Sequence, residues 1–398
     1  MFETYLKRSG SVPLEVQIRD PSLNLLETLV PHTSRLSSLT VVMYDSVGLR
    51  RLARHLGNPI PTLTEFSIVG GGYGLTIPSD IRNGHFLHVK KLRLAQVPSL
   101  RAPCAFPHVT ELVWIGGSYT FGSASNLRDT FLGLPALERV EIVFQEFHTP
   151  ITHAQLVTLP NVQRMSLHCS EGELPGFLEF LKLPNLTSLV VSGLRRPTQP
   201  FVVLPTIPFG ENLPNFAQLS EMEVTMFRGQ QRISFRSPAQ ATLDYYLGPR
   251  LLRQVHRGHS SKHWGGLPVD SIRKLVVEMD TWTTDRDDGW AFSLLCELSS
   301  LEHLEFRSRC GHTPRYLRQM MEVAAYFPEM KTLAVYFRSE REARHVYRLE
   351  DIVDGLGSGI SVTWTKDSEI PNDEQREPES GRASWNYHSD YRVGGSKC

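Results

Sequence analysis

One short pattern recurs along most of this chain: an apolar residue, two variable residues, a second apolar residue, one variable residue and a third apolar residue. Alternation of apolar and variable residues is the period of a β-strand with one buried face. The pattern occurs at Leu36/Leu39/Val41, Leu63/Phe66/Ile68, Val89/Leu92/Leu94, Val109/Leu112/Trp114, Leu137/Val140/Ile142, Val162/Met165/Leu167, Leu186/Leu189/Val191, Leu219/Met222/Val224, Ile272/Leu275/Val277, Leu301/Leu304/Phe306 and Met330/Leu333/Val335. A unit of this size cannot bury one face of a strand alone, so neighbouring units must stack.

The segment just before the pattern is repeated as well. Prolines precede it at nearly the same place in several units, after a leucine at Leu134-Pro135, Leu159-Pro160 and Leu183-Pro184 and without one at Pro61, Pro107 and Pro328. Proline ends the preceding segment and keeps the chain extended before a strand. Most units also follow one another at or near the 20–29-residue period of leucine-rich repeats. An ordinary α/β domain with repeated strands is the alternative.

We therefore predict an α/β fold over residues 1–365: an irregular leucine-rich-repeat solenoid, or horseshoe, with a concave parallel β-sheet and helices or loops behind it. Val12–Ile18 and Ile360–Trp364 are expected to be its first and last strands. Regular units carry an asparagine or cysteine three residues beyond the third apolar position. Several units of this chain lack it, so the backbone at the turns must find other partners.

Two segments depart from the repeat. The interval from Leu219 to Ile272 is the longest between units, and we expect residues 226–269 to form a loop-rich insertion that projects from the solenoid, with Ile233–Phe235 as a candidate extra strand. Residues 366–398 are rich in proline, glutamate, serine and glycine and contain few aliphatic residues. This composition predicts a disordered C-terminal tail.

Variable positions inside the pattern point away from the core and form the predicted binding surface. The columns just before and just after the second apolar position contain both signs of charge. The candidate partner-binding residues in these columns are Glu65, Lys91, Arg93, Glu111, Arg139, Glu141, Arg164, Glu221, Glu223, Lys274, His303 and Glu305. Mixed charge on one face suits recognition of a protein partner, although each residue taken singly fits a solvated surface equally well.

Composition narrows the class of partner. Lys plus Arg equals Asp plus Glu at 42 each, so the formal net charge is zero. A nucleic-acid binder normally has a basic surplus, and attraction to anionic membranes needs one as well. No secretory signal opens the chain, no apolar run approaches the roughly 20 residues of a membrane span, and the five cysteines show no CxxC spacing. We predict an intracellular protein, cytoplasmic or nuclear, with neither nucleic acid nor membrane as a partner.

No residue pattern predicts an enzyme, a catalytic residue, a metal site or a cofactor. His256, His259 and His263 have a spacing that could ligate zinc. No cysteine or carboxylate lies close enough in the sequence to complete a tetrahedral set of ligands. An enzyme that uses these histidines is the least favoured hypothesis.

The opening segment Phe2-Glu-Thr-Tyr-Leu-Lys-Arg-Ser-Gly-Ser-Val-Pro-Leu-Glu-Val16 resembles the segment that follows the F-box in many fungal proteins of the F-box/leucine-rich-repeat family. There, a short helix leads into the first strand. The Leu-Pro-Asn lead-ins Leu159–Asn161 and Leu183–Asn185 are similar to that family as well, and the resemblance covers roughly residues 1–365. It implies substrate recognition for a cullin-based ubiquitin ligase. An F-box would lie before Met1, so a Skp-type linker and a cullin are expected partners only if one precedes this segment. The alternative is an interaction scaffold unrelated to ubiquitin.

Overall fold

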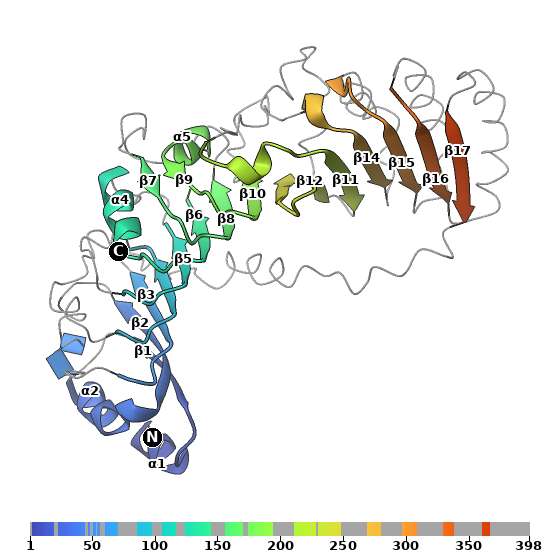
Figure 1. Cartoon of the computed structure of the whole chain (residues 1–398). Helices are drawn as coiled ribbons and strands as arrows, with labels where there is room; N and C mark the ends of the chain where they lie inside the picture. The colour runs from blue at the N-terminus through green and yellow to red at the C-terminus, as the bar shows by residue number, and fades with distance from the viewer. Residues whose placement is uncertain are drawn as a thin grey trace, which may run out of the picture.

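The computed structural model describes residues 2–19, 23–43, 47, 51–52, 54–55, 60–70, 86–97, 106–116, 124–144, 156–169, 174–193, 211–227, 230–247, 269–279, 297–308, 329–337 and 360–366. This part of the chain is an α/β structure with few helices and one open 15-stranded sheet, which does not close into a barrel. Figure 1 shows the sheet extending from the N-terminal strands to β17 at the far end. Within the described residues, no helix has the length and apolarity to cross a membrane.

The strands follow one another in space almost in the order of the sequence. Their spatial order is β1 (Leu14–Arg19), β2 (Leu36–Met43), β3 (Glu65–Gly70), β4 (Lys91–Ala95), β5 (Glu111–Ile115), β6 (Arg139–Val143), β8 (Arg164–Cys169), β10 (Ser188–Gly193), β13 (Thr242–Leu247), β12 (Gln230–Arg236), β11 (Glu221–Phe227), β14 (Lys274–Met279), β15 (His303–Ser308), β16 (Thr332–Phe337) and β17 (Ser361–Lys366). All neighbours are parallel except those of β12, which is antiparallel to β11 and β13. The expected parallel sheet and its first and last strands are confirmed.

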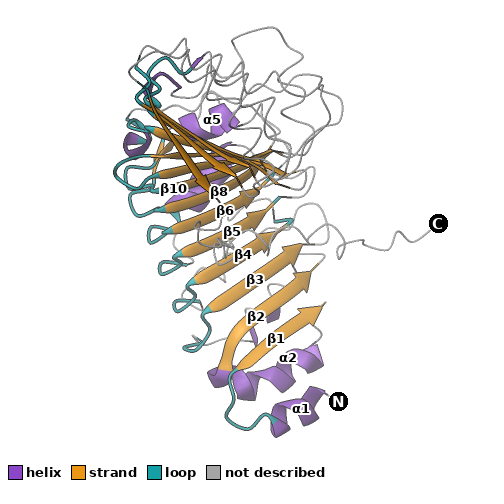
Figure 2. Cartoon of the chain, turned by 90° about the vertical axis from the view of Figure 1, so that its right-hand side faces the viewer, coloured by secondary structure: helices purple, strands orange, loops and turns teal. Residues whose placement is uncertain are grey.

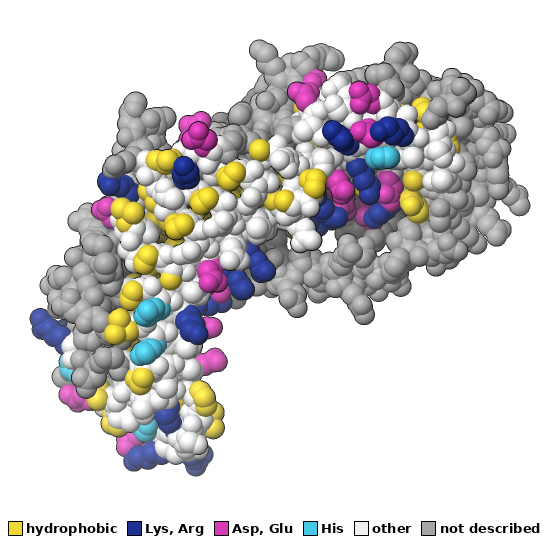
Figure 3. Space-filling model, in the orientation of Figure 1, with side chains coloured by type: hydrophobic (Ala, Val, Ile, Leu, Met, Phe, Trp, Pro, Cys, Tyr) yellow, Lys and Arg dark blue, Asp and Glu magenta, His cyan; other side chains and the backbone are white. Residues whose placement is uncertain are grey.

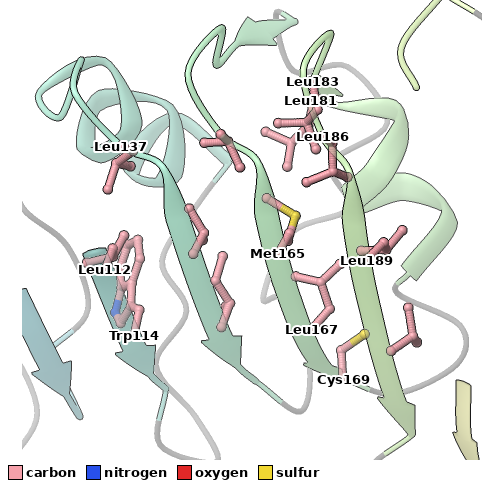
Figure 4. Packing of buried hydrophobic residues seen from close by; sticks show 14 of the residues in the cluster. Leu112, Trp114, Leu137, Met165, Leu167, Cys169, Leu181, Leu183, Leu186 and Leu189 are labelled. Atoms are coloured by element: carbon pink, nitrogen blue, oxygen red, sulfur yellow. The ribbon is translucent and has the colours of Figure 1, made fainter. Parts of the chain in front are cut away.

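The buried face of the sheet is built from the apolar positions of the repeated pattern. Leu112 and Trp114 on β5 are fully buried, and so is Val109, which opens the same unit. Figure 4 shows the apolar side chains of neighbouring strands pointing into one interior. A further apolar residue, three positions before the pattern, joins this core. In several units the backbone N–H that opens the pattern donates to its carbonyl, for example from Leu186 to Leu183 at 3.3 Å, so these units begin with the same turn.

Helices and short segments cover this buried face. They are α1 (Phe2–Arg8), α2 (Leu23–Leu29), η1 (Val30–Arg35), α4 (Ala124–Leu132), α5 (Leu174–Glu179), η3 (Pro214–Phe216), η5 (Val269–Ser271) and a small sheet of β7 (Val157–Thr158) and β9 (Leu181–Lys182). Phe131 of α4 and Phe177 of α5 belong to the same buried cluster as the strand residues. Figure 2 shows α1 and α2 at the β1 end of the sheet and α5 behind β8 and β10.

Aromatic rings fill part of the interior behind β3 and β4. Phe86 and Phe106 come from the turns that precede β4 and β5, and Phe66 comes from β3. The centroid of the Phe86 ring lies 4.4 Å from that of Phe66 and 5.8 Å from that of Phe106, and all three rings are stacked. Stacked rings bury a large apolar area with a defined geometry, so these three side chains join successive units. The residues 71–85 that connect β3 to the Phe86 turn lie outside the described part of the chain.

Asparagines of the Leu-Pro-Asn lead-ins connect successive units by hydrogen bonds. The Nδ2 of Asn161 donates to the carbonyl of Pro135 at 3.0 Å, and that of Asn185 donates to the carbonyl of Pro160 at 2.7 Å. Asn215 repeats the contact with the carbonyl of Pro184 at 3.3 Å. After the strands, backbone groups of neighbouring units bond each other directly, for example the N–H of Gly116 to the carbonyl of Val143 at 2.7 Å.

The segment expected to be a loop-rich insertion at about 226–269 differs from that prediction. Residues 230–236 and 242–247 form β12 and β13, an antiparallel pair inside the sheet between β10 and β11. The physical reason is burial, because Phe235 and Tyr245 alternate with polar residues and are at most 1% exposed. Ile233–Phe235 is confirmed as an extra strand. Residues 248–268 lie outside the described part of the chain, as does the tail after Lys366, the last residue of β17.

Candidate protein-binding surface

Side chains on the face opposite the core form columns that run across the sheet, because the strands pair in register. The first column contains Glu65, Lys91, Glu111, Arg139 and Arg164 on five successive strands, β3 to β8, and Glu221, Lys274 and His303 on β11, β14 and β15. The second column contains Arg93 and Glu141, then Glu223 and Glu305. All the sequence-predicted site residues therefore lie on one face, which we call the open face.

The hairpin of β12 and β13 divides these residues into two groups. Between Arg164 on β8 and Glu221 on β11 lie three strands, β10, β13 and β12. The structure thus brings together the predicted residues of β3 to β8, and separately those of β11 to β15. Sequence order alone places a single unit, that of Leu189, between the two groups, and the hairpin adds two further strands.

The group on β11 to β15 is extensively paired. Arg236 contacts Glu223 at 2.9 Å, and Glu305 contacts both Lys274 at 3.8 Å and Arg307 at 2.7 Å. Figure 3 shows acidic and basic side chains interleaved in this region of the surface. The Glu305 side chain is only 13% exposed, so solvent screens these ion pairs less than it would on an open surface.

A third column, two residues beyond the second, contains charged and aromatic residues that are not among the sequence-predicted site residues. The guanidinium of Arg232 contacts Asp244 at 3.0 Å and lies 5.6 Å from the ring centroid of Tyr246. Arg307 lies 5.9 Å from the ring centroid of Tyr336. Continuing the alternation beyond Glu305 would have found Arg307. Arg232 and Asp244 could be found only by placing β12 and β13 in the sheet.

Neighbouring charges hold Arg307 in its charged form. Burial lowers the pKa of its guanidinium, but the hydrogen bond that it donates to Glu305 and the charges of Glu305, Glu278 and Glu223 outweigh burial and raise that pKa above its usual value. A charge that is paired and hydrogen-bonded in this way is held in place. This part of the open face consequently carries paired charges of both signs.

Toward the other end of the sheet, the third column is apolar. Val42, Val69, Ala95, Ile115 and Val143 occupy it on β2 to β6 in register. Val42, Ile115 and Val143 are half-buried, so part of their apolar surface reaches solvent. This apolar strip lies on the same strands as the charged residues of the first two columns.

A polar group marks the end of the apolar strip at β8. His168 is hydrogen-bonded through its Nδ1 to the Ser192 hydroxyl, and its Nε2 lies 4.0 Å from the Glu141 carboxylate. Burial lowers the pKa of His168, and burial also raises the pKa of Glu141, against which the charge of Arg93 acts. Both shifts favour the neutral forms of the two side chains.

Two arginines of the first column differ from the other cations of the open face. Arg139 and Arg164 are register partners on β6 and β8, and both are exposed. Among the described residues, neither makes an ion pair at 4.0 Å or less. Lys91, in the same column, contacts Glu111 at 3.2 Å.

A hollow of about 550 Å³ opens where β6, β8 and β10 begin. Most of its lining residues have polar side chains, and the full lining consists of Thr110, Ala136, Glu138, Pro160, Asn161, Gln163, Asn185 and Thr187. Glu138 and Gln163 immediately precede Arg139 and Arg164 in the sequence, so the hollow adjoins the arginine pair. Amide and hydroxyl groups of this kind hydrogen-bond peptide groups readily.

The residues of the open face in the described part of the chain can bind a partner through ion pairs, hydrogen bonds and apolar contacts. Within that part, no group of three or more His, Cys, Asp or Glu could hold a metal ion. His256, His259 and His263 lie outside the described residues. No family model matches this chain, and no curated protein matches its sequence.

Proposed function

We propose that this chain is an irregular leucine-rich-repeat solenoid that binds another protein through its open face, which is the concave side of the solenoid. The support for the solenoid is structural repetition. Successive parallel strands pair with their neighbours in sequence, and the same turn and the same asparagine bond recur between units. Repetition of a unit that contacts only its neighbours is the defining property of such proteins.

The observation that carries the proposed binding function is the alignment of charged side chains in register on one face of the sheet, while the other face is core. These side chains keep substantial exposure, for example 41% for Lys91 and 45% for Arg236. Neighbouring strands lie about 4.8 Å apart, so the columns from β3 to β15 extend over roughly 48 Å of sheet. A stable protein interface needs about 800 Å² from each partner, which a face of this length provides.

Within that function, we propose that the chain is the substrate-recognition part of an F-box-type ubiquitin ligase subunit. The support is the resemblance of Phe2–Val16 to the segment after an F-box, together with the observation that α1 ends at Arg8 and β1 begins at Leu14. A Skp-type linker and a cullin would join through an upstream F-box. The alternative is a scaffold unrelated to ubiquitin, for which the balanced open face is equally suitable.

The binding function is tested by reversing charge on the open face. The triple variant Arg139→Glu/Glu141→Arg/Arg164→Glu is expected to lose at least about tenfold of the partner that the wild-type chain captures from cell extract, measured by quantitative mass spectrometry, since like-charge contacts cost several kcal/mol. The matched control Arg128→Glu/Asp129→Arg reverses charge on α4, which covers the core face, and should capture normally. Undiminished capture by the triple variant, with an unchanged circular dichroism spectrum, would refute the choice of face.

The ligase role is tested separately. Mapping the 5′ end of the native transcript shows whether an F-box is encoded upstream, and the natural full-length product is then purified with its partners. Copurification of a Skp-type linker and a cullin supports the ligase role. Capture of a partner without either of them supports the scaffold.

A further inference from the structure

The arginine pair is a local surplus of positive charge in a chain whose formal net charge is zero. On β4 to β8, the first two columns contain the cations Lys91, Arg93, Arg139 and Arg164 against the carboxylates Glu111 and Glu141. Glu111 is already paired with Lys91, and the charge of Arg93 acts on Glu141. The column continues past Arg164 with uncharged Ser188. On the side of β10, the first column therefore has no carboxylate next to the two guanidiniums.

Two like charges on neighbouring strands repel each other. On β11 to β15 the corresponding cations are neutralised by the sheet itself, through Arg236 with Glu223 and Lys274 with Glu305. The Arg139–Arg164 pair is thus the part of the open face at which an added anion would gain most. Guanidinium forks bind carboxylates through paired hydrogen bonds.

The surroundings of the pair indicate the shape of the anion. The polar hollow adjoins the arginines where the strands begin, and the strip residues Ile115 and Val143 lie four residues further along β5 and β6. Four residues of extended chain span about 13 Å, and residues four apart point to the same side of a strand. An extended peptide lying along β6 would therefore place one side chain over the arginines and another, four residues away, over the apolar strip.

Resting on the proposed binding function, we propose that Arg139 and Arg164 clamp the carboxylate of an extended acidic segment of the protein partner, whose apolar side chain four residues away packs on Ile115 and Val143. The polar side chains that line the hollow, Gln163 among them, lie beside the main chain of this segment. Glu141 lies on β6 midway between Arg139 and Val143 and would repel a second acidic side chain. The residue of the segment midway between its carboxylate and its apolar side chain is therefore uncharged.

The test uses an array of synthetic peptides in which a glutamate and a leucine are separated by three residues. Matched peptides carry glutamine for the glutamate, or place the leucine at other separations. Wild-type protein is expected to bind the glutamate peptide at least about tenfold better than the glutamine peptide, and to prefer the separation of three. Arg139→Gln/Arg164→Gln should lose the glutamate preference. Lys331→Gln removes a cation that is paired with Glu302 and lies outside the candidate binding residues, and this variant should retain the preference.

The clamp is overturned if wild-type protein shows no preference for glutamate, or if the folded double variant keeps it. Ile115→Ser/Val143→Ser should lose the dependence on leucine while keeping the preference for glutamate, and failure to do so removes the apolar part of the inference. These outcomes are distinct from failure of the proposed function, which is judged by capture of the natural partner. A partner that is lost on charge reversal but insensitive to Arg139→Gln/Arg164→Gln would leave the binding function standing and the acidic-segment clamp refuted.

Discussion

At the scale of single residues, the same type of side chain has different consequences in different surroundings. Asn161 and Asn185 are exposed, yet each holds a backbone carbonyl of the preceding unit. His168 is largely buried on the sheet face between Glu141 and Ser192, and burial lowers its pKa. Neither role can be assigned from residue type, because both depend on which carbonyl or hydroxyl the neighbouring strand supplies.

Replacement of His168 should change the pH dependence of stability. The unfolded chain gains a proton on this histidine below about pH 6.5, whereas the folded chain resists it because burial lowers the pKa. Proton binding by the unfolded state makes the free energy of unfolding decrease as the pH falls through this value toward the lower folded pKa. His168→Asn should reduce that decrease, measured by urea unfolding at several pH values. Glu141 is present in both proteins, so identical slopes would contradict the prediction.

At the scale of elements, the hairpin of β12 and β13 is an integral part of the sheet and contributes buried side chains to the core. It separates β10 from β11 by two strands, while Asn215 in the turn before β11 still reaches the carbonyl of Pro184 before β10. The units remain stacked at their lead-ins, and the hairpin occupies the widened space between the strands. Its apolar side chains continue the core without interruption, with Phe235 edge-on to Tyr245 at a centroid distance of 6.4 Å.

Phe235→Ala should therefore destabilise the protein strongly. Phe235 is fully buried, and removal of a buried phenylalanine side chain costs about 3–5 kcal/mol. The neighbouring Arg236→Ala removes only a half-exposed ion pair with Glu223 and should cost about 1 kcal/mol or less. Both values are measured by chemical denaturation. Equal and small effects would mean that the hairpin is a dispensable insertion.

At the scale of the whole molecule, the stability of the described sheet depends on contacts between neighbouring units. β1 pairs only with β2, and β17 only with β16, so the ends are linked through every strand between them. In such one-dimensional stacks, a local defect weakens its own region first. The two groups of charged residues on the open face consequently belong to regions that can differ in stability.

Matched core substitutions at the two ends should reveal this behaviour. Leu39 on β2 is fully buried and Leu304 on β15 nearly so, at 1%. Leu39→Ala is expected to speed amide hydrogen exchange in β1 to β3 more than in β14 to β16, and Leu304→Ala the reverse, followed by mass spectrometry. Uniform loss of protection in both variants would show that the sheet unfolds as one cooperative unit.

The sequence by itself determined the strands, their parallel order at both ends and the face that each strand buries, because burial of alternate apolar residues is a local requirement. It also placed the predicted site residues on one face for the same reason. Tertiary structure decided where β12 and β13 lie, because an antiparallel pair can either project from a sheet or enter it, and only burial of Phe235 and Tyr245 against other units distinguishes the two. It likewise decided which charges are neutralised. Pairing across strands depends on register, which leaves Lys274 with a carboxylate and the neighbouring guanidiniums of Arg139 and Arg164 without an ion pair in the described part of the chain.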